Sequence, residues 1–244
     1  LLLAFPLSST LATKSLINSV HNIINPITID CSRNNLELAK YELSQIVGRD
    51  VKDMSKDEII RATAESASEN SVDGIFAPLF WIFIGSLMWK YSTSLPGPLA
   101  YGFAFKGIST LDSMLGYKKN SLKWMGAFSA KIDDLAVFVP CRCVALSLPL
   151  ICRSWRKVPA IIYKSFQEGV KDSSPNSGLS EAIYANCFDI HMGGKNYYNG
   201  EALIKPKIGL NNPKPTINSI RKILKSSLYL EVLWSIAMIT ILYL

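Results

Sequence analysis

The chain has 244 residues, of which 49% are hydrophobic and 18% charged, and its formal net charge is +7. Clustered apolar residues at this level are unusual for a soluble domain, so we expect a membrane protein with short or tilted helices. The lysines and arginines are scattered and not interleaved with aromatic residues, which argues against nucleic acid as a partner. The five cysteines form no C-x-x-C pair, so they indicate neither a disulfide framework nor a zinc site.

Apolar and polar segments alternate along the chain, which we treat as a single domain, 1–244. The apolar segments are 1–13, 75–89, 95–111, 135–151 and 228–244, and the polar segments are 21–73, 112–131 and 153–227. The pattern predicts a mostly α fold, a multi-pass membrane helical bundle whose polar loops form a site at the membrane surface. Buried helices of a soluble protein are the alternative. The chain opens inside an apolar run without Met, so we expect its natural start to be missing.

Basic charge gives conflicting signals about topology. The polar segments 112–131 and 153–227 are both basic, and basic loops tend to stay on the cytoplasmic side. Only the apolar segment 135–151 separates them. This segment is therefore either re-entrant or an exception to the charge rule.

Local signals place several elements in chain order. Residues 34–47 have helical periodicity, and Ser55 with Glu58 forms a capping box for a helix from Lys56 to about Val72. The turn at 94–99 predicts a helical hairpin over 75–111, followed by a polar loop. We expect a loop at 173–182, capped by Ser180, and irregular structure at 191–209. No segment shows sustained β alternation.

Three acids share one face of the helix predicted before the second apolar segment. Glu65, Glu69 and Asp73 are spaced four residues apart, and Arg61 lies one turn earlier on the same face. Like charges at this spacing repel by a few tenths of a kcal/mol per pair. A cation, a basic partner segment or solvent would offset that repulsion.

Further acids lie where apolar helices begin or end. Asp112 follows the third apolar segment, and Asp133 and Asp134 open the fourth. If the helices form a bundle, these ends could converge on a site for Mg²⁺, which bridges carboxylates to phosphates. Ordinary interface charges are the alternative. Arg142 lies inside an apolar helix, where a cation usually pairs with an acid or meets a ligand.

Two loops rich in small residues could bind phosphate through backbone N–H groups. They are SPNSG at 174–178 and MGGKNYYNG at 192–200, where Lys195 adds charge. Neither matches a P-loop or a dinucleotide-binding pattern. As patterns alone, both are more typical of ordinary loops.

Six motifs together resemble one known family. They are IVGRD (46–50), RATAESASENSVDGIFAPLF (61–80), K-x-x-x-TLDSMLGYK (106–118), DDLAVFVPCR (133–142), SPNSG…EA (174–182) and GGKNYY…GE (193–201). Their order is that of the cobalamin-biosynthesis membrane proteins of the CbiB/CobD type, the cobinamide or adenosylcobinamide-phosphate synthases. The resemblance covers roughly residues 10 to 215. Ser109, Ser180 and Asn199 depart from the family pattern.

The resemblance implies a multi-pass enzyme of the inner membrane with its active site on the cytoplasmic side. It implies an ATP-dependent, amide-forming ligase that joins (R)-1-amino-2-propanol or its O-phosphate to the free propionate of adenosylcobyric acid. ATP and Mg²⁺ are the expected cofactors, and the partners are these substrates, the lipid bilayer and other corrinoid-pathway enzymes. A transporter or a corrinoid-binding assembly subunit without catalysis is the alternative. A CDP-alcohol phosphotransferase is disfavoured because Asn70 replaces the first acid of its motif.

The resemblance also implies roles for individual residues. Those expected to be catalytic are Glu65, Glu69, Asp73 and Asp112, of which Glu69, Asp73 and Asp112 would hold Mg²⁺. Those expected to bind substrate are Arg61, Asn70, Lys106, Lys118, Asp133, Asp134, Arg142, Ser174, Asn176, Gly193, Gly194, Asn196 and Tyr197.

Overall fold

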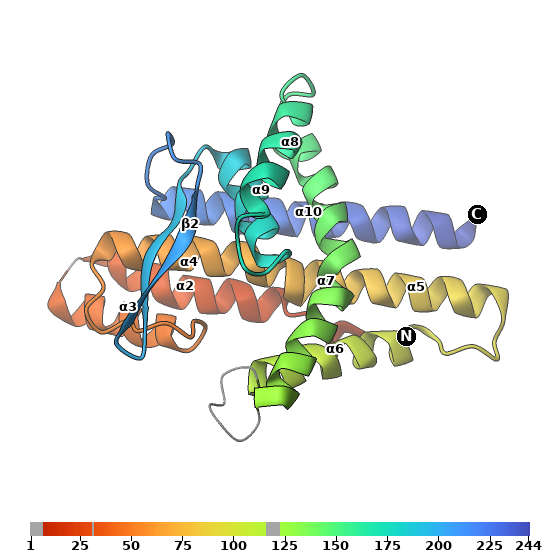
Figure 1. Cartoon of the computed structure of the whole chain (residues 1–244). Coiled ribbons are helices and arrows are strands. Elements are labelled where there is room, and N and C mark those ends of the chain that lie inside the picture. Colours follow the sequence, from red (N-terminus) through yellow and green to blue (C-terminus); the bar gives the residue numbers. More distant parts are fainter. Residues whose placement is uncertain (1–6, 31, 116–122) are drawn as a thin grey trace.

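The computed structural model describes residues 7–30, 32–115 and 123–244, and the fold is mostly helical (Figure 1). In chain order the elements are α2 (Thr13–Ile29), α3 (Arg33–Ser44), α4 (Lys56–Ser71), η1 (Val72–Phe76), α5 (Ala77–Tyr91), α6 (Pro98–Leu115), α7 (Lys123–Cys152), α8 (Val158–Gly169), α9 (Ser177–Phe188), β1 (Met192–Tyr198), β2 (Glu201–Ile208) and α10 (Ile217–Tyr243).

The longest continuous element runs through α4, η1 and α5. The predicted capping box is confirmed: the Glu58 backbone N–H donates to Ser55, and the Glu58 side chain accepts from the Ser55 backbone. The π-helical turn η1 interrupts the α-helical register, so the residues after it are rotated by roughly 100° relative to an uninterrupted α-helix. Gly74 in this turn accepts a hydrogen bond from the Ala12 N–H at 2.8 Å. A Cβ at Gly74 would lie 3.0 Å from that of Ala12, so the glycine permits this close approach.

The predicted helical hairpin is confirmed by α5 and α6, which pack side by side. At its tip, a Cβ on Gly97 would lie 2.8 Å from the Trp89 ring. The polar loop that we predicted after residue 111 is wrong in part, because α6 continues to Leu115. Asp112 therefore projects from the last turn of a helix rather than from a loop.

The helix α7 is longer than the apolar segment that predicted it. It starts at Lys123, so Asp133 and Asp134 lie well inside it. The expectation that they occupy a helix N-terminus was wrong, because the preceding residues 124–132 also have a helical pattern that continues into the apolar run. In Figure 1, α7 crosses α5 and α10 at a steep angle.

The expectation of irregular structure at 191–209 was wrong, because β1 and β2 form an antiparallel hairpin there. Its turn is Asn199–Gly200, with positive φ at both residues (53° and 81°). Asn-Gly is a strong signal for a two-residue hairpin turn, and it is present in the sequence. A register shift between Met192 and Gly194 places Gly194 opposite Lys205. The predicted Ser180 cap was also wrong, since α9 begins at Ser177.

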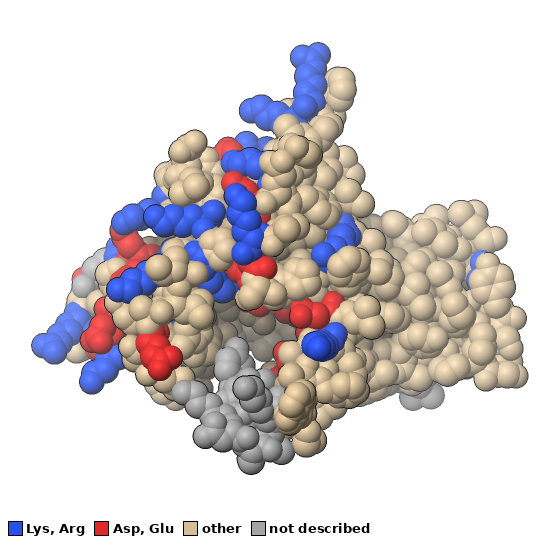
Figure 2. All heavy atoms as spheres, in the orientation of Figure 1, with Lys and Arg blue, Asp and Glu red and all other residues tan. Residues whose placement is uncertain are grey.

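The main hydrophobic core joins α2, α4, α7, α9 and α10, with Phe76, Leu148, Ile183 and Tyr184 fully buried in it. Among the described residues, three helices are long and apolar enough to cross a membrane. They are Lys56–Tyr91, Trp124–Cys152 and Ile217–Tyr243. Figure 2 shows few charged side chains on the end of the molecule formed by the outer parts of α5 and α10.

Candidate functional site

A polar cavity of about 720 Å³ opens between α2, the loop after α3, α4, η1, α6, α7 and the β hairpin. A smaller cavity of about 210 Å³ adjoins it, between α4, η1, α6, α7 and the segment that leads into α9. Four predicted acids line both cavities: Glu69, Asp73, Asp112 and Asp133. Figure 2 shows a hollow near the middle of this face with acidic side chains at its border. The structure thus brings together acids from three separate helices, as the sequence analysis expected.

These four acids lack a cationic partner in the part of the chain that the structure describes. No ion pair joins any of them to a lysine or arginine there. One carboxylate oxygen of Asp133, Oδ1, is buried and has no hydrogen-bond partner among the residues that the structure describes. Burial raises the pKa of Asp112, and the nearby Asp134 carboxylate raises it further. Such an arrangement of carboxylate oxygens is suited to a hard cation.

The carboxylates of the cavity fit a Mg²⁺ ion whose other ligands are waters and substrate phosphates. Across residues 7–30, 32–115 and 123–244, no three His, Cys, Asp or Glu side chains are placed to hold a metal ion between them. Mg²⁺ usually binds through one or two carboxylates and completes its shell with waters and substrate phosphates. The cavity offers the carboxylates and has room for phosphates beside them.

The wall of the smaller cavity is built from α7 and the segment before α9. Ser174 Oγ donates to Asp134 Oδ1 at 3.0 Å, and Asn176 Nδ2 donates to the Asp134 backbone oxygen at 2.7 Å. Arg142, about two turns further along α7, donates from Nη1 to Asn176 Oδ1 at 2.6 Å. Within the described residues, Arg142 therefore binds the amide of this loop rather than an acid. These contacts fix the loop against the cavity.

Glu65 is separated from the other acids and lines neither cavity. Its carboxylate lies 2.7 Å from Arg49 Nη1 and 3.1 Å from Arg61 Nη1, and it accepts from the Gly193 N–H at 2.8 Å. The side chain of Glu65 is only 1% exposed. It forms a buried ion pair with two arginines and so differs from the expected cavity acid.

Arg61 extends this buried network to the β hairpin. It donates to the backbone oxygens of Gly193 at 2.8 Å and Lys195 at 3.0 Å, and to Asn196 Oδ1 at 3.0 Å. Arg49 also donates to Asn196 Oδ1, at 2.9 Å. The predicted residues Arg61, Gly193 and Asn196 are therefore brought together, but they join the hairpin to α4 and do not line a cavity.

Of the remaining predicted residues, some line one of the two cavities and others do not. Asn70 lines the larger cavity, and Ser174 and Asn176 line the smaller one. Lys106 is exposed on α6, while Gly194 and Tyr197 lie on β1, and none of the three lines either of these two cavities. Lys118 lies outside the described residues.

Several residues that line the larger cavity or contact its lining were not predicted from the sequence. Arg49, Tyr198 and Lys205 line the larger cavity, and Glu181 forms an ion pair with Lys205 at 2.9 Å. Arg49 and Glu181 belong to the quoted motifs IVGRD and SPNSG…EA, which are the signals that could have identified them. Lys205 had no such signal, because the pairing of β1 with β2 brings it to the cavity.

Comparisons with known proteins point to one family. The sequence model of the family described as CobD/Cbib protein matches residues 1–227. The chain is 39% identical over 202 residues to the cobalamin biosynthesis protein CobD of Synechocystis sp., covering 83% of the chain and 56% of that relative. It is 38% identical to the CobD protein of Leptospira interrogans, covering 82% of the chain and 59% of the relative.

A third relative carries the other family name. The chain is 37% identical over 206 residues to the cobalamin biosynthesis protein CbiB of Salmonella typhimurium, covering 82% of the chain and 58% of that relative. The chain thus spans less than two thirds of the length of these curated relatives. No solved structure matches the chain.

Proposed function

The chain belongs to the CobD/CbiB protein family, and we propose that it acts as an enzyme of cobalamin (vitamin B12) biosynthesis. The names of its relatives and the convergence of acids at one cavity support this proposal. The observation that carries it is the set of Glu69, Asp73, Asp112 and Asp133, which line two adjoining cavities without a cationic partner among the described residues.

The proposed reaction is ATP-dependent amide formation between the free propionate of adenosylcobyric acid and aminopropanol or its O-phosphate. The carboxylate oxygen takes the γ-phosphoryl group of ATP, which leaves ADP and an acyl phosphate. The amine nitrogen then attacks the acyl carbon, inorganic phosphate leaves, and a base takes the proton from nitrogen. Both carboxylate activation and amide formation require stabilisation of phosphoryl charge.

The acids of the cavity are suited to two of these tasks. We assign Glu69 and Asp73 to Mg²⁺, which would neutralise phosphate charge when bound. We assign Asp112 to proton transfer, because burial and the Asp134 carboxylate raise its pKa and make its ionised form a stronger base. Asp133, whose buried Oδ1 has no hydrogen-bond partner within the described part of the chain, would complete the set.

We further propose that α5 and α10 enter the inner membrane while α7 lies along its cytoplasmic surface. Helices that cross at a steep angle do not span the same bilayer together, and α7 crosses both of the others (Figure 1). From residue 226 to the end of the chain, Glu231 is the single charge, and Lys90 is the single charge in α5. The cavity would then open at the membrane surface.

The experiment that tests the proposed function uses the full-length protein in detergent. Adenosylcobyric acid, ATP, Mg²⁺ and aminopropanol phosphate or free aminopropanol are supplied, and mass spectrometry detects the amide. We expect ATP-dependent product from the wild type, and at least about a hundred-fold less from Glu69→Gln. Glu37→Gln is the matched control, because Glu37 lies on the exposed face of α3 away from the cavities. No product from folded wild type with either amine would overturn the proposal.

A further inference from the structure

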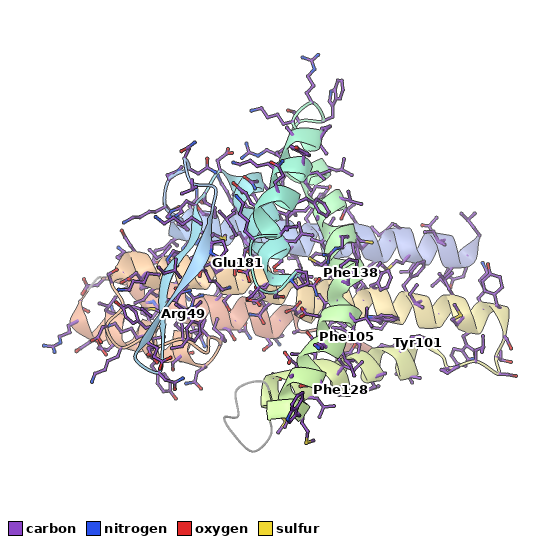
Figure 3. All side chains as sticks on the ribbon, in the orientation of Figure 1. Arg49, Tyr101, Phe105, Phe128, Phe138 and Glu181 are labelled. Carbon is purple, nitrogen blue, oxygen red and sulfur yellow. The ribbon has the colours of Figure 1, made fainter. Side chains whose placement is uncertain are left out.

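The larger cavity has a cationic wall as well as an acidic one. Lys205 on β2 and Arg49 in the loop after α3 both line it, together with Glu69, Asp73 and Asp112. Figure 3 shows Arg49 beside the β hairpin and Glu181, the partner of Lys205, on α9. A ligand in this cavity therefore meets both carboxylates and two cations.

Lys205 keeps hydrogen-bonding capacity for a ligand. Its Nζ donates to Glu181 Oε1 at 2.9 Å and lies 3.8 Å from Asp172 Oδ2. The lysine side chain is 18% exposed, whereas that of Glu181 is 1% exposed. An ammonium group carries three hydrogens in rotatable positions, so donors remain for a group inside the cavity.

Lys205 and Glu181 shift each other's pKa. Burial and the neighbouring Glu65 raise the pKa of Glu181 to about 8, although Lys205 opposes this effect. The pKa of Lys205 is raised by Glu181, Glu69 and Asp172 despite its burial.

Arg49 is held firmly in place. Its Nη1 lies 2.7 Å from the Glu65 carboxylate and donates to Asn196 Oδ1 at 2.9 Å, and its side chain is 7% exposed. A guanidinium has five N–H donors in a fixed plane, so one nitrogen fixed by the protein leaves others to bind an oxyanion. The following residue, Asp50, accepts from the N–H groups of Asn199 and Gly200, which ties the loop to the hairpin turn.

We propose that Lys205 and Arg49 form an anion subsite of the larger cavity, which receives a phosphoryl or carboxylate group in the same cavity as the acidic residues. The identity of the anion rests on the proposed function. Its sources would be the phosphates of ATP, the phosphate of aminopropanol phosphate, or the propionate of adenosylcobyric acid. The basic residues expected from the sequence to bind substrate include Arg61, Lys106 and Lys118. Arg61 and Lys106 do not line the cavity, and Lys118 lies outside the described residues.

The test measures ligand binding, so that it does not depend on turnover. The full-length protein in detergent is titrated by calorimetry with ATP, aminopropanol phosphate, free aminopropanol and adenosylcobyric acid in turn. Lys205→Met should weaken binding of at least one anion by about ten- to a hundred-fold, as expected for loss of one charge-assisted hydrogen bond. Lys207→Met is the matched control, because Lys207 is exposed on the same strand and lines neither cavity.

The ligand whose binding is weakened in Lys205→Met identifies the source of the anion. Loss confined to aminopropanol phosphate, with free aminopropanol unaffected, assigns the subsite to the phosphate of the amine. Loss for ATP or adenosylcobyric acid assigns it to the nucleotide or to the propionate. If Lys205→Met binds every anion as tightly as the wild type does, the subsite is wrong. If binding depends on Lys205 while the wild type makes no amide, the subsite stands and the proposed function fails.

A second variant separates the anion subsite from a purely structural role. Lys205→Met alone leaves Glu181 buried without its partner, and this could weaken binding by disturbing the fold. The double variant Glu181→Gln/Lys205→Met removes both charges of the pair. If the subsite is correct, the double variant binds anion as weakly as Lys205→Met does. If binding recovers to the wild-type level, Lys205 serves only to neutralise Glu181 and the proposal is overturned.

Discussion

The guanidinium of Arg49 lies 2.7 Å from the carboxylate of Glu65, and the side chains are 7% and 1% exposed. This contact joins the loop after α3 to the middle of α4. Arg61 approaches the same carboxylate at 3.1 Å and reaches the hairpin. Glu65 thus holds together the parts of the chain that place Arg49 at the cavity.

Glu65→Gln should therefore destabilise the protein rather than remove a reacting group. Removing one partner of a buried ion pair costs about 3–5 kcal/mol, because the other charge stays buried without compensation. We expect a marked fall in the temperature of unfolding, measured in detergent by circular dichroism. Glu69→Gln should leave that temperature nearly unchanged, since no ion pair with Glu69 is present among the described residues. Equal unfolding temperatures for the two variants would contradict this assignment.

Glu181 predicts a pH dependence of stability. Its folded-state pKa of about 8 lies above its ordinary value of 4.5, so the folded protein retains a proton that the unfolded chain has lost. This contribution is fully present below about pH 4.5 and is lost as the pH rises through about 8. The difference in unfolding free energy between the wild type and Glu181→Gln, measured across this range, should fall with rising pH. A difference independent of pH would contradict the raised pKa.

The bulge in the β hairpin predicts that alanine substitutions at two adjacent glycines destabilise the protein by different amounts. Both have positive φ, 81° at Gly193 and 103° at Gly194. A Cβ at Gly193 would lie 2.0 Å from the Pro206 carbonyl oxygen, whereas one at Gly194 would meet nothing within 4 Å. Gly194→Ala should cost only the backbone strain, about 1–3 kcal/mol. Gly193→Ala should cost clearly more, because the hairpin must shift as well.

Thermal unfolding of the two alanine variants checks this order. Gly107→Ala on α6 is a suitable control, since a Cβ there meets nothing within 4 Å and no positive φ is required. Equal destabilisation at 193 and 194 would show that the hairpin accommodates the contact with Pro206.

Local signals in the sequence predicted the helices well. The Ser55–Glu58 capping box and the turn at 94–99 each lie within a few residues of the structure they specify, so no distant contact was needed. Boundaries were less accurate where a helical pattern continued into polar residues, as at Asp112 and Asp133. The β hairpin was not predicted, although Asn199–Gly200 specifies its turn, because its strands show little alternation of apolar and polar residues.

The acidic part of the site was predicted better than its basic part. Glu69 and Asp73 were predicted because four-residue spacing puts them on one helix face, and Asp112 because it ends an apolar segment that packs beside that helix. The basic residues depend on pairing between distant segments. Arg49 is positioned by Glu65 and Asn196, and Lys205 by Glu181, and neither contact follows from spacing along the chain.

The orientation of α7 in the membrane gives the last prediction. Leu135 and Leu146 are exposed on α7 and lie eleven residues apart, as do Val232 and Tyr243 on α10. Eleven residues of α-helix rise by about 16 Å. With single nitroxide labels at these positions in liposomes, the two labels on α10 should differ in membrane depth by up to about 16 Å. The two labels on α7 should lie at nearly the same shallow depth, because that helix would run along the surface.

Power saturation in the presence of oxygen and of a water-soluble relaxation agent measures these depths. The α10 pair is the internal control, since it reports the depth difference of a helix that enters the bilayer. If the two α7 labels differ in depth as much as the α10 labels, α7 spans the membrane and its steep crossing of α5 and α10 is not kept in lipid. Because Asp133 and Asp134 precede Leu135, a shallow α7 would place the acidic wall of the cavity at the membrane surface, where charged substrates from water reach it.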